Sequence, residues 1–185
     1  MHSVKPVQNF NEQIILGRFE ATANLLVDQT MMHFNDLLYP ATVRAHVDVE
    51  SKKTLFPYIG ELAAQALGLD ASEVAEGLVE RERLGSTGFG KGVALPHAKL
   101  AGLAGVRGLF LQLAKPVDFE AVDALPVDLI FVLLSPVDSG AEHLKALARA
   151  SRFLRDEKEV SKLRGVKSSE ALYALLATDQ ERDAA

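Results

Sequence analysis

The feature that most constrains the fold is an apolar run from Val127 to Leu134, interrupted only by Asp128. A strand that is apolar on both faces needs cover on both faces, as the inner strands of α/β proteins have. The segments around this run carry apolar residues at helical spacing, for example Val74 and Leu78. We therefore predict an α/β fold of one domain, in which a mixed β-sheet is flanked by helices on both faces.

Spacing and capping residues place the other elements. Pro57 fits the first turn of its helix if Thr54 is the N-cap, whereas that turn is irregular if Ser51 is the cap. In the first half we expect a helix that carries Leu55, Ile59, Leu62 and Ala66 and stops at Gly68, followed by a helix over 70–84 and a strand over 106–113. After the apolar run we expect a helix that starts at Asp138 or Ser139 and carries Leu144, Leu147 and Leu154. A short helix ending at Gly165 and a last helix capped by Ser168 or Ser169 complete the expected elements.

Composition excludes several classes of function. The chain has 185 residues, 48% of them hydrophobic, which suits one domain with a substantial core. Its formal net charge of −5 argues against nucleic-acid binding, and the absence of cysteine excludes disulfides and thiolate sites. The longest uninterrupted apolar run, 129–134, is far shorter than the ~20 residues that cross a bilayer, and the N-terminus lacks a secretion signal. We expect a cytoplasmic protein without membrane insertion.

The chemistry is concentrated in a glycine-rich run from Gly85 to Lys99 that contains His97. Its glycines let a backbone or a ligand approach closely, and Ser86 and Thr87 can donate hydrogen bonds to an anion. Pro96 restricts the residue before it to an extended conformation, so the chain reaches the histidine stiffly. The run is a histidine beside an anion-binding surface or a hairpin whose histidine is incidental, and composition leaves both interpretations open.

The order of residues resembles a known family. The pattern GSTG-x-G-x-G-x-A-x-PH-x-K is similar to the phosphorylation site of enzyme IIA proteins of the bacterial phosphotransferase system, in the fructose/mannitol class and its nitrogen-regulatory branch. Segments 118–123 and 127–136 resemble that family as well, and His143 stands where the family has a second histidine. The similarity extends from about residue 35 to about residue 177 and implies the enzyme IIA fold.

The resemblance also implies roles for individual residues. His97 is the phosphorylated residue, Arg81 is an arginine close to it, and His143 orients it or bonds the phosphoryl group. From spacing alone, Arg81 would instead pair with Glu80 or Glu82, and His143 would be a half-buried structural residue.

The remaining polar residues of the run have two interpretations each. Ser86 and Thr87 bind the phosphate or only shape the turn, and Lys99 assists partner docking or touches the phosphate. Neutral imidazole is a good nucleophile near neutral pH, and phosphoryl transfer between histidines needs positioned donors rather than a metal. No cluster of His, Asp and Glu at metal-ligand spacing is present, so we expect no metal and no cofactor.

We assign residues 1–31 to an N-terminal extension, either disordered or adding one strand or short helix. Residues 32–178 form the enzyme IIA type-2 phosphocarrier domain, and residues 179–185 a C-terminal tail. The predicted function is a phosphohistidine phosphocarrier of the nitrogen-related system. It accepts phosphate on His97 from an HPr-like protein and regulates targets, such as a transporter or a kinase, by its phosphorylation state.

Three other functions are considered. A sugar-specific enzyme IIA would pass phosphate to an enzyme IIB for fructose or mannitol uptake, and a pure binding module would never carry phosphate. A nucleotide-binding enzyme is suggested by G-x-x-x-x-G-K over 85–91, but Gly92 replaces the required Ser or Thr and no helix follows. The order Gly-Ser-Thr-Gly is not a G-x-S-x-G nucleophile elbow, so a hydrolase is set aside.

Overall fold

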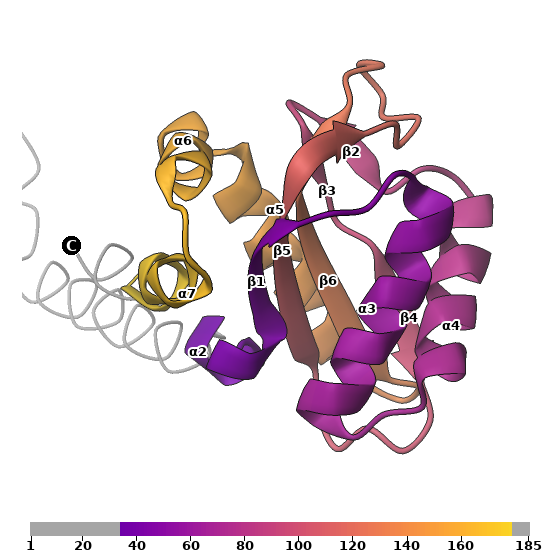
Figure 1. The fold of residues 1–185 in the computed structure, drawn as a ribbon. Helices are drawn as coiled ribbons and strands as arrows, with labels where there is room; N and C mark the ends of the chain where they lie inside the picture. Colours follow the sequence, from indigo (N-terminus) through magenta and orange to yellow (C-terminus); the bar gives the residue numbers. More distant parts are fainter. Residues whose placement is uncertain (1–33, 179–185) are drawn as a thin grey trace, which may run out of the picture. The chain divides into compact units, whose positions relative to one another are not determined.

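A mixed β-sheet lies between two layers of helices in the computed structural model, which describes residues 34–178 (Figure 1). The predictions made for residues 1–31 and 179–185 lie outside the described residues and stay predictions. In chain order the elements are α2 (Phe34–Leu37), the 3-10 turn η1 (Pro40–Thr42), β1 (Val43–Val47), α3 (Lys52–Leu67), α4 (Ala71–Arg83), β2 (Gly88–Gly90), β3 (Val93–Ala94), β4 (His97–Leu100), β5 (Arg107–Val117), β6 (Val127–Pro136), α5 (Gly140–Arg155), α6 (Glu157–Gly165) and α7 (Ser169–Ala177).

The strands follow the order β1-β5-β6-β3-β2, with β4 also paired to β6. Pairs β1–β5, β3–β6 and β4–β6 are parallel, whereas β5–β6 and β2–β3 are antiparallel. The predicted mixed sheet is therefore confirmed. Both β3 and β4 use β6 as their partner, so the glycine-rich run is held along one strand.

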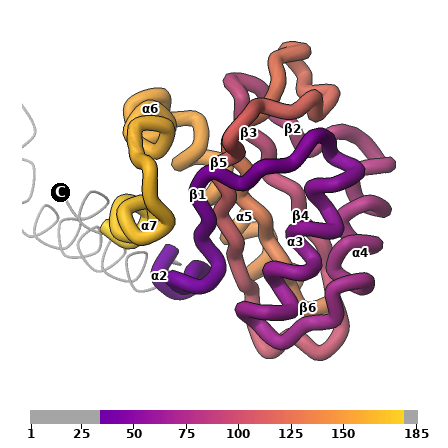
Figure 2. Tube along the Cα trace, in the orientation of Figure 1, coloured from indigo at the N-terminus to yellow at the C-terminus, as the bar shows by residue number. Residues whose placement is uncertain are grey.

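Side chains of β5 and β6 alternate between two separate hydrophobic clusters, as the period of two along a strand requires. Leu111 and Ile130 belong to the cluster that includes α3 and α4. Phe110 and Phe131 belong to the cluster that includes α2, α5, α6 and α7. The two groups of helices lie on opposite sides of the strands in the trace of Figure 2. The apolar run predicted to be covered on both faces is covered on both faces, since 129–134 has no exposed side chain.

The start of α3 decides between the two N-caps considered for it. The residue before the helix is Ser51, so Thr54 is not the N-cap and Pro57 is the sixth helical residue. Thr54 supports the cap from the third helical position, because its Oγ1 accepts from the Ser51 amide at 3.2 Å. Pro57 therefore lies beyond the first turn, and its ring nitrogen cannot donate to the helix. Gly68 ends the helix in the left-handed conformation with φ of 71°, as expected.

The other helix caps agree more closely with the sequence. Asp70 accepts a hydrogen bond from the Glu73 amide at 2.9 Å at the start of α4. The N-cap of α5 is Ser139, whose hydroxyl donates to the Pro136 carbonyl at 2.7 Å rather than capping the helix. Ser168 caps α7 through the amide of Ala171. No helix among residues 34–178 is long and apolar enough to cross a membrane.

Candidate functional site

His97 is the first residue of β4 and pairs in parallel register with Leu133 of β6. Ala98 and Leu100 point into the cluster of α3 and α4. Successive side chains of a strand point to opposite faces, so His97 and Lys99 face the α5 side of the sheet. The strand thus places the histidine half-buried beside the start of α5.

Two hydrogen bonds determine which nitrogen of His97 carries the hydrogen and which carries the lone pair. Arg81 Nε donates to His97 Nε2 at 2.9 Å, and His97 Nδ1 lies 3.0 Å from the carbonyl oxygen of Leu95. A guanidinium only donates and a carbonyl only accepts. The hydrogen is therefore assigned to Nδ1, and the lone pair of the ring to Nε2.

Arg81 links the end of α4, the following loop and the histidine. It lies in the last turn of α4, and its Nη1 donates to the Gly85 carbonyl at 3.0 Å. Its side-chain hydrogen bonds within residues 34–178 go to His97 and Gly85, and none goes to Glu80 or Glu82. The guanidinium is thus held in place from two sides.

His143 lies in the first turn of α5, where its side chain is only 8% exposed. The ring centroids of His143 and His97 are 5.5 Å apart, so the structure brings these two histidines together with Arg81. Ser135 Oγ lies 2.7 Å from His143 Nδ1 and is fully buried. Sequence reasoning missed Ser135, because only the register of β4 with β6 places this strand residue next to the site.

Both histidines have a lowered pKa. Burial is the main cause for His97, and the positive charge of Arg81 adds to it, although the Leu95 carbonyl and Glu82 oppose the shift of its pKa. Burial is again the main cause of the lowered pKa of His143, followed by its proximity to His97 and Lys99. Since both pKa values lie below 6.5, both rings are neutral at neutral pH, which is the nucleophilic form of imidazole.

The hydroxyl groups of Ser86 and Thr87 are used within the loop. Ser86 Oγ donates to the Phe119 carbonyl at 2.6 Å and accepts from the Gly88 amide at 3.1 Å. Thr87 Oγ1 donates to Glu82 Oε2 at 2.6 Å. These bonds shape the turn, and neither hydroxyl hydrogen is directed at His97. Phosphate binding by the two residues stays a prediction.

Glu82 and Lys52 hold this loop against the helices. Lys52 Nζ donates to Glu82 Oε1 at 3.2 Å, to Glu120 Oε2 at 2.7 Å and to the Phe119 carbonyl at 3.1 Å. Burial alone would lower the pKa of Lys52, but the hydrogen bonds to Glu120 and Glu82 outweigh it and raise the pKa. Sequence reasoning missed both roles, and Glu82 appeared there only as a partner for Arg81.

Lys99 and three apolar side chains that are close in sequence to site residues are exposed. Lys99 Nζ donates to the Val137 carbonyl at 3.3 Å, so the ammonium remains at the surface. Leu84, Val137 and Leu144 are 85%, 55% and 66% exposed and follow or adjoin site residues in the chain. A role for Lys99 in docking is compatible with this position and stays a prediction. Among residues 34–178, no group of three His, Asp or Glu side chains has metal-binding geometry.

The chain matches a known family over almost all of the residues that the structure describes. Residues 36–179 match the family "Phosphoenolpyruvate-dependent sugar phosphotransferase system, EIIA 2". The chain is 44% identical over 146 residues to a protein of Bradyrhizobium diazoefficiens named "Nitrogen regulatory protein", an alignment that covers 79% of this chain and 95% of that protein.

Solved structures share the fold. The crystal structure of the nitrogen regulatory protein IIA-Ntr from Neisseria meningitidis aligns with a TM-score of 0.70 at 37% identity, covering 77% of this chain and 98% of that one. The crystal structure of IIA mannitol from Escherichia coli aligns with a TM-score of 0.63 at 20% identity, covering 76% and 99%. At that lower identity, the second likeness supports the fold alone.

Proposed function

Because the chain belongs to the EIIA 2 family of the phosphoenolpyruvate-dependent sugar phosphotransferase system, we propose that it is a phosphocarrier that is phosphorylated on His97. The observation that carries this proposal is the hydrogen bond from Arg81 Nε to His97 Nε2 at 2.9 Å. It supports the proposal, because a cationic donor held beside Nε2 can turn to the oxygens of a phosphoryl group on that nitrogen.

The transfer step follows from the tautomer of His97. The lone pair of Nε2 attacks the phosphorus of a phosphohistidine donor, and the donor's P–N bond breaks with its electron pair returning to the donor imidazole. The Arg81 Nε–H moves from the nitrogen to an oxygen of the arriving group. The Leu95 carbonyl keeps the hydrogen on Nδ1 throughout and stabilises the positive charge that the ring gains.

His143 is proposed to be the second donor. Ser135 Oγ can donate to the Nδ1 of His143, which leaves the hydrogen of this neutral ring on Nε2. An Nε2–H group on a ring 5.5 Å from that of His97 is available to a phosphoryl oxygen between the two. Burial of both rings strengthens such a hydrogen bond.

The donor and the targets belong to the proposal as well. We assign the role of donor to an HPr-like protein in the cytoplasm and propose that the phosphorylation state regulates target proteins, in keeping with the relatives named nitrogen regulatory proteins. Phosphorylation adds about −1.5 to −2 charges to a site that is otherwise neutral at its two histidines. A tenfold preference of a target for one state needs only about 1.4 kcal/mol.

Sugar transport is the second candidate, because the matched family is described as a sugar phosphotransferase system. Such an enzyme IIA passes its phosphate on to an enzyme IIB. Incubation of the phosphorylated protein with fructose- and mannitol-specific IIB domains separates the two roles. Rapid transfer to a IIB domain, with identical pull-down partners for His97→Ala and His97→Asp, supports transport over regulation.

The carrier function is tested by labelling with the HPr-like donor. The wild type takes up acid-labile, alkali-stable phosphate, and His97→Ala takes up none while keeping its thermal unfolding midpoint. The matched control is His46→Ala, which removes an exposed histidine of β1 and keeps full labelling. Undiminished labelling of His97→Ala contradicts the assignment.

A further inference from the structure

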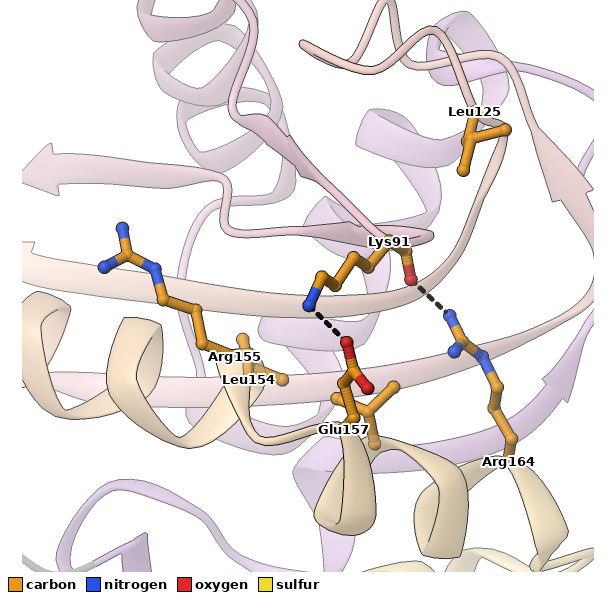
Figure 3. Close-up of a pocket in the computed structure, with 7 residues that line it drawn as sticks. Lys91, Leu125, Leu154, Arg155, Glu157 and Arg164 are labelled. Atoms are coloured by element: carbon orange, nitrogen blue, oxygen red, sulfur yellow. Dashed lines mark hydrogen bonds and ion pairs between the residues drawn. The ribbon is translucent and has the colours of Figure 1, made fainter.

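Away from the site around His97, a hollow of about 400 Å³ lies between the β2–β3 turn and the junction of α5 with α6 (Figure 3). None of its lining residues belongs to the site around His97. Ligand sites for small molecules typically enclose about 300–1,000 Å³, with mostly apolar walls and a few polar groups. The size of the hollow therefore suits a small molecule.

The floor of the hollow is apolar and packed. Leu154 and Val160 line it and are 1% and 4% exposed, so their side chains are fixed by the core beneath them. Leu125 lines it from the loop before β6 and is 53% exposed. An apolar group placed in the hollow would cover Leu125 from water, which favours binding.

The charged groups of the hollow carry an excess of positive charge. Arg164 is held by two 2.7 Å hydrogen bonds to Asp128, and Lys91 forms an ion pair with Glu157. Arg155 lines the same hollow, and its side chain makes no hydrogen bond or ion pair with another residue of the described range 34–178. Figure 3 shows the Lys91–Glu157 pair in the middle, between Arg155 on one side and Arg164 on the other.

The backbone at Lys91, which carries its side chain to the hollow, has a strained conformation. Lys91 has φ of 56° between two glycines that also have positive φ, a region where a residue with a Cβ costs roughly 1–2 kcal/mol. Asp123 accepts from the Lys91 amide at 2.8 Å, and Arg164 Nη2 donates to its carbonyl at 2.7 Å. Charged groups from two other segments therefore fix the turn that carries Lys91 to the hollow.

We propose that this hollow binds a small carboxylate with an apolar body. The carboxylate pairs with the free guanidinium of Arg155, whose planar donors match its two oxygens, and the body lies against Leu154, Val160 and Leu125. Among the described residues that line the hollow, Arg155 is the one cation without an ion-pair partner, and the floor is apolar. One unpaired cation beside an apolar floor favours a monoanion over a phosphate, which carries more charge. Binding is independent of the phosphorylation of His97.

Sodium hexanoate is the probe, followed by amide NMR shifts of the wild-type chain, with hexan-1-ol and inorganic phosphate as comparison ligands. A ligand this small binds with Kd on the order of 1 mM, so titration extends to roughly ten times that concentration. We expect saturable shifts at Lys91, Arg155 and Val160 for hexanoate. The alcohol and phosphate produce at least tenfold weaker binding, because each lacks one of the two complementary parts.

Two exposed variants and their matched controls separate the site from a general charge effect. Arg155→Gln and Leu125→Asp weaken hexanoate binding about tenfold or more, since one removes the cation and the other places a carboxylate on the apolar wall. Arg83→Gln and Val122→Asp make the same charge changes outside the hollow and leave binding unchanged. Absence of saturable shifts, equal binding of phosphate, or equal binding by Arg155→Gln and Arg83→Gln overturns the proposal. Phosphorylated and unphosphorylated wild-type protein are expected to bind hexanoate equally, and a difference between the two overturns the independence from phosphorylation.

Discussion

The stretch from Lys91 to His97, within the glycine-rich segment 85–99, is held in place at its two ends by opposite means. At the His97 end, the contacts are strand pairing with β6 and hydrogen bonds to a ring that is neutral. At the Lys91 end, three successive residues have positive φ and charged side chains hold the turn. The end at His97 is therefore held without an ion pair to its ring, whereas the end at Lys91 is held by ion pairs.

This difference separates catalysis from stability along one short segment. Arg81 donates a hydrogen bond to His97 Nε2, the nitrogen proposed to accept phosphate, so its removal is expected to affect transfer more than folding. Gly92 touches Arg164 and Asp128, so its substitution is expected to affect folding more than transfer.

Arg81→Ala and His143→Ala each slow phosphate acceptance by roughly 10²–10³-fold, the scale for the loss of one preorganised donor. Arg81→Ala changes the free energy of unfolding by less than about 0.5 kcal/mol, and His143→Ala lowers it by about 1–2 kcal/mol because Ser135 loses its buried partner. Quenched-flow labelling and urea unfolding measure the two quantities. The control is Arg83→Ala, which removes an exposed arginine from the same helix turn as Arg81. Normal transfer rates in both Arg81→Ala and His143→Ala would show that these residues have only structural roles.

Gly92→Ala lowers the free energy of unfolding by about 2–3 kcal/mol, because strain at positive φ and a steric clash add together. An added Cβ would lie 2.5 Å from Arg164 Nη2 and 3.0 Å from Asp128 Oδ1, at φ of 76°. Gly102→Ala is the matched control, since its φ is 77° and nothing lies within 4 Å of the added Cβ, so it costs only about 1 kcal/mol. Equal losses in urea unfolding would show that the ionic end does not resist displacement.

Acidification acts on the two ends in different pH ranges. Because the pKa of His97 is lowered from 6.5, the rate of phosphate acceptance stays constant from pH 8 to about 6.5 and falls up to tenfold per pH unit below the lowered pKa. As the pH falls, His97 takes up a proton at a higher pH in the unfolded chain than in the folded chain. The free energy of unfolding is therefore constant above pH 6.5 with respect to this group and declines as the pH falls below 6.5.

The carboxylates of the Lys91 end are protonated only in the acid range. The pKa values of Asp123 and Glu157 are lowered from 3.8 and 4.5 by the amide and the ammonium of Lys91, respectively. Their contribution to stability is present above those values and is lost as the pH falls through the lowered pKa values. Unfolding followed from pH 8 to pH 3 should show two separate declines, and His97→Asn should remove part of the upper one only. A single decline centred below pH 4 would contradict the lowered pKa of His97.

Ser135→Ala has the smallest expected effect, a loss of about threefold to tenfold in the rate of phosphate acceptance. It removes one hydrogen bond worth about 1 kcal/mol and frees the ring of His143 to populate both tautomers. ¹⁵N NMR of the imidazole nitrogens detects the tautomers directly. Ser139→Ala is the control, since its hydroxyl bonds the Pro136 carbonyl and not the histidine. An unchanged tautomer of His143 in Ser135→Ala would remove the positioning role.

The sequence predicted the layers of the fold better than the details of the site. The run ending at Leu134 and the helices were recognisable because their patterns repeat over many residues. Strands β2 and β3 have only three and two residues, and β2 contains two glycines, so no periodic pattern could identify them. The five residues of β1 alternate only weakly between apolar and polar side chains, so this strand was also missed.

The site depended on contacts between distant segments. His97, Arg81 and His143 could be named because they match a family pattern, not because spacing predicts their contact. Ser135 and Glu82 were missed because their roles arise from strand register and from a loop folding back on α4. Such roles become visible only when both partners have a position in space.

The pairing of β4 with β6 has a consequence for the order in which the chain is made. Synthesis proceeds from the N-terminus, so α4 and the segment up to Lys99 leave the ribosome before β6 exists. His97 then has Arg81 available but neither the strand that aligns it nor the helix that brings His143. A nascent chain therefore completes the proposed phosphate-acceptor site only when α5 has emerged, and a product truncated before Val127 carries the whole glycine-rich segment without the strand that supports it.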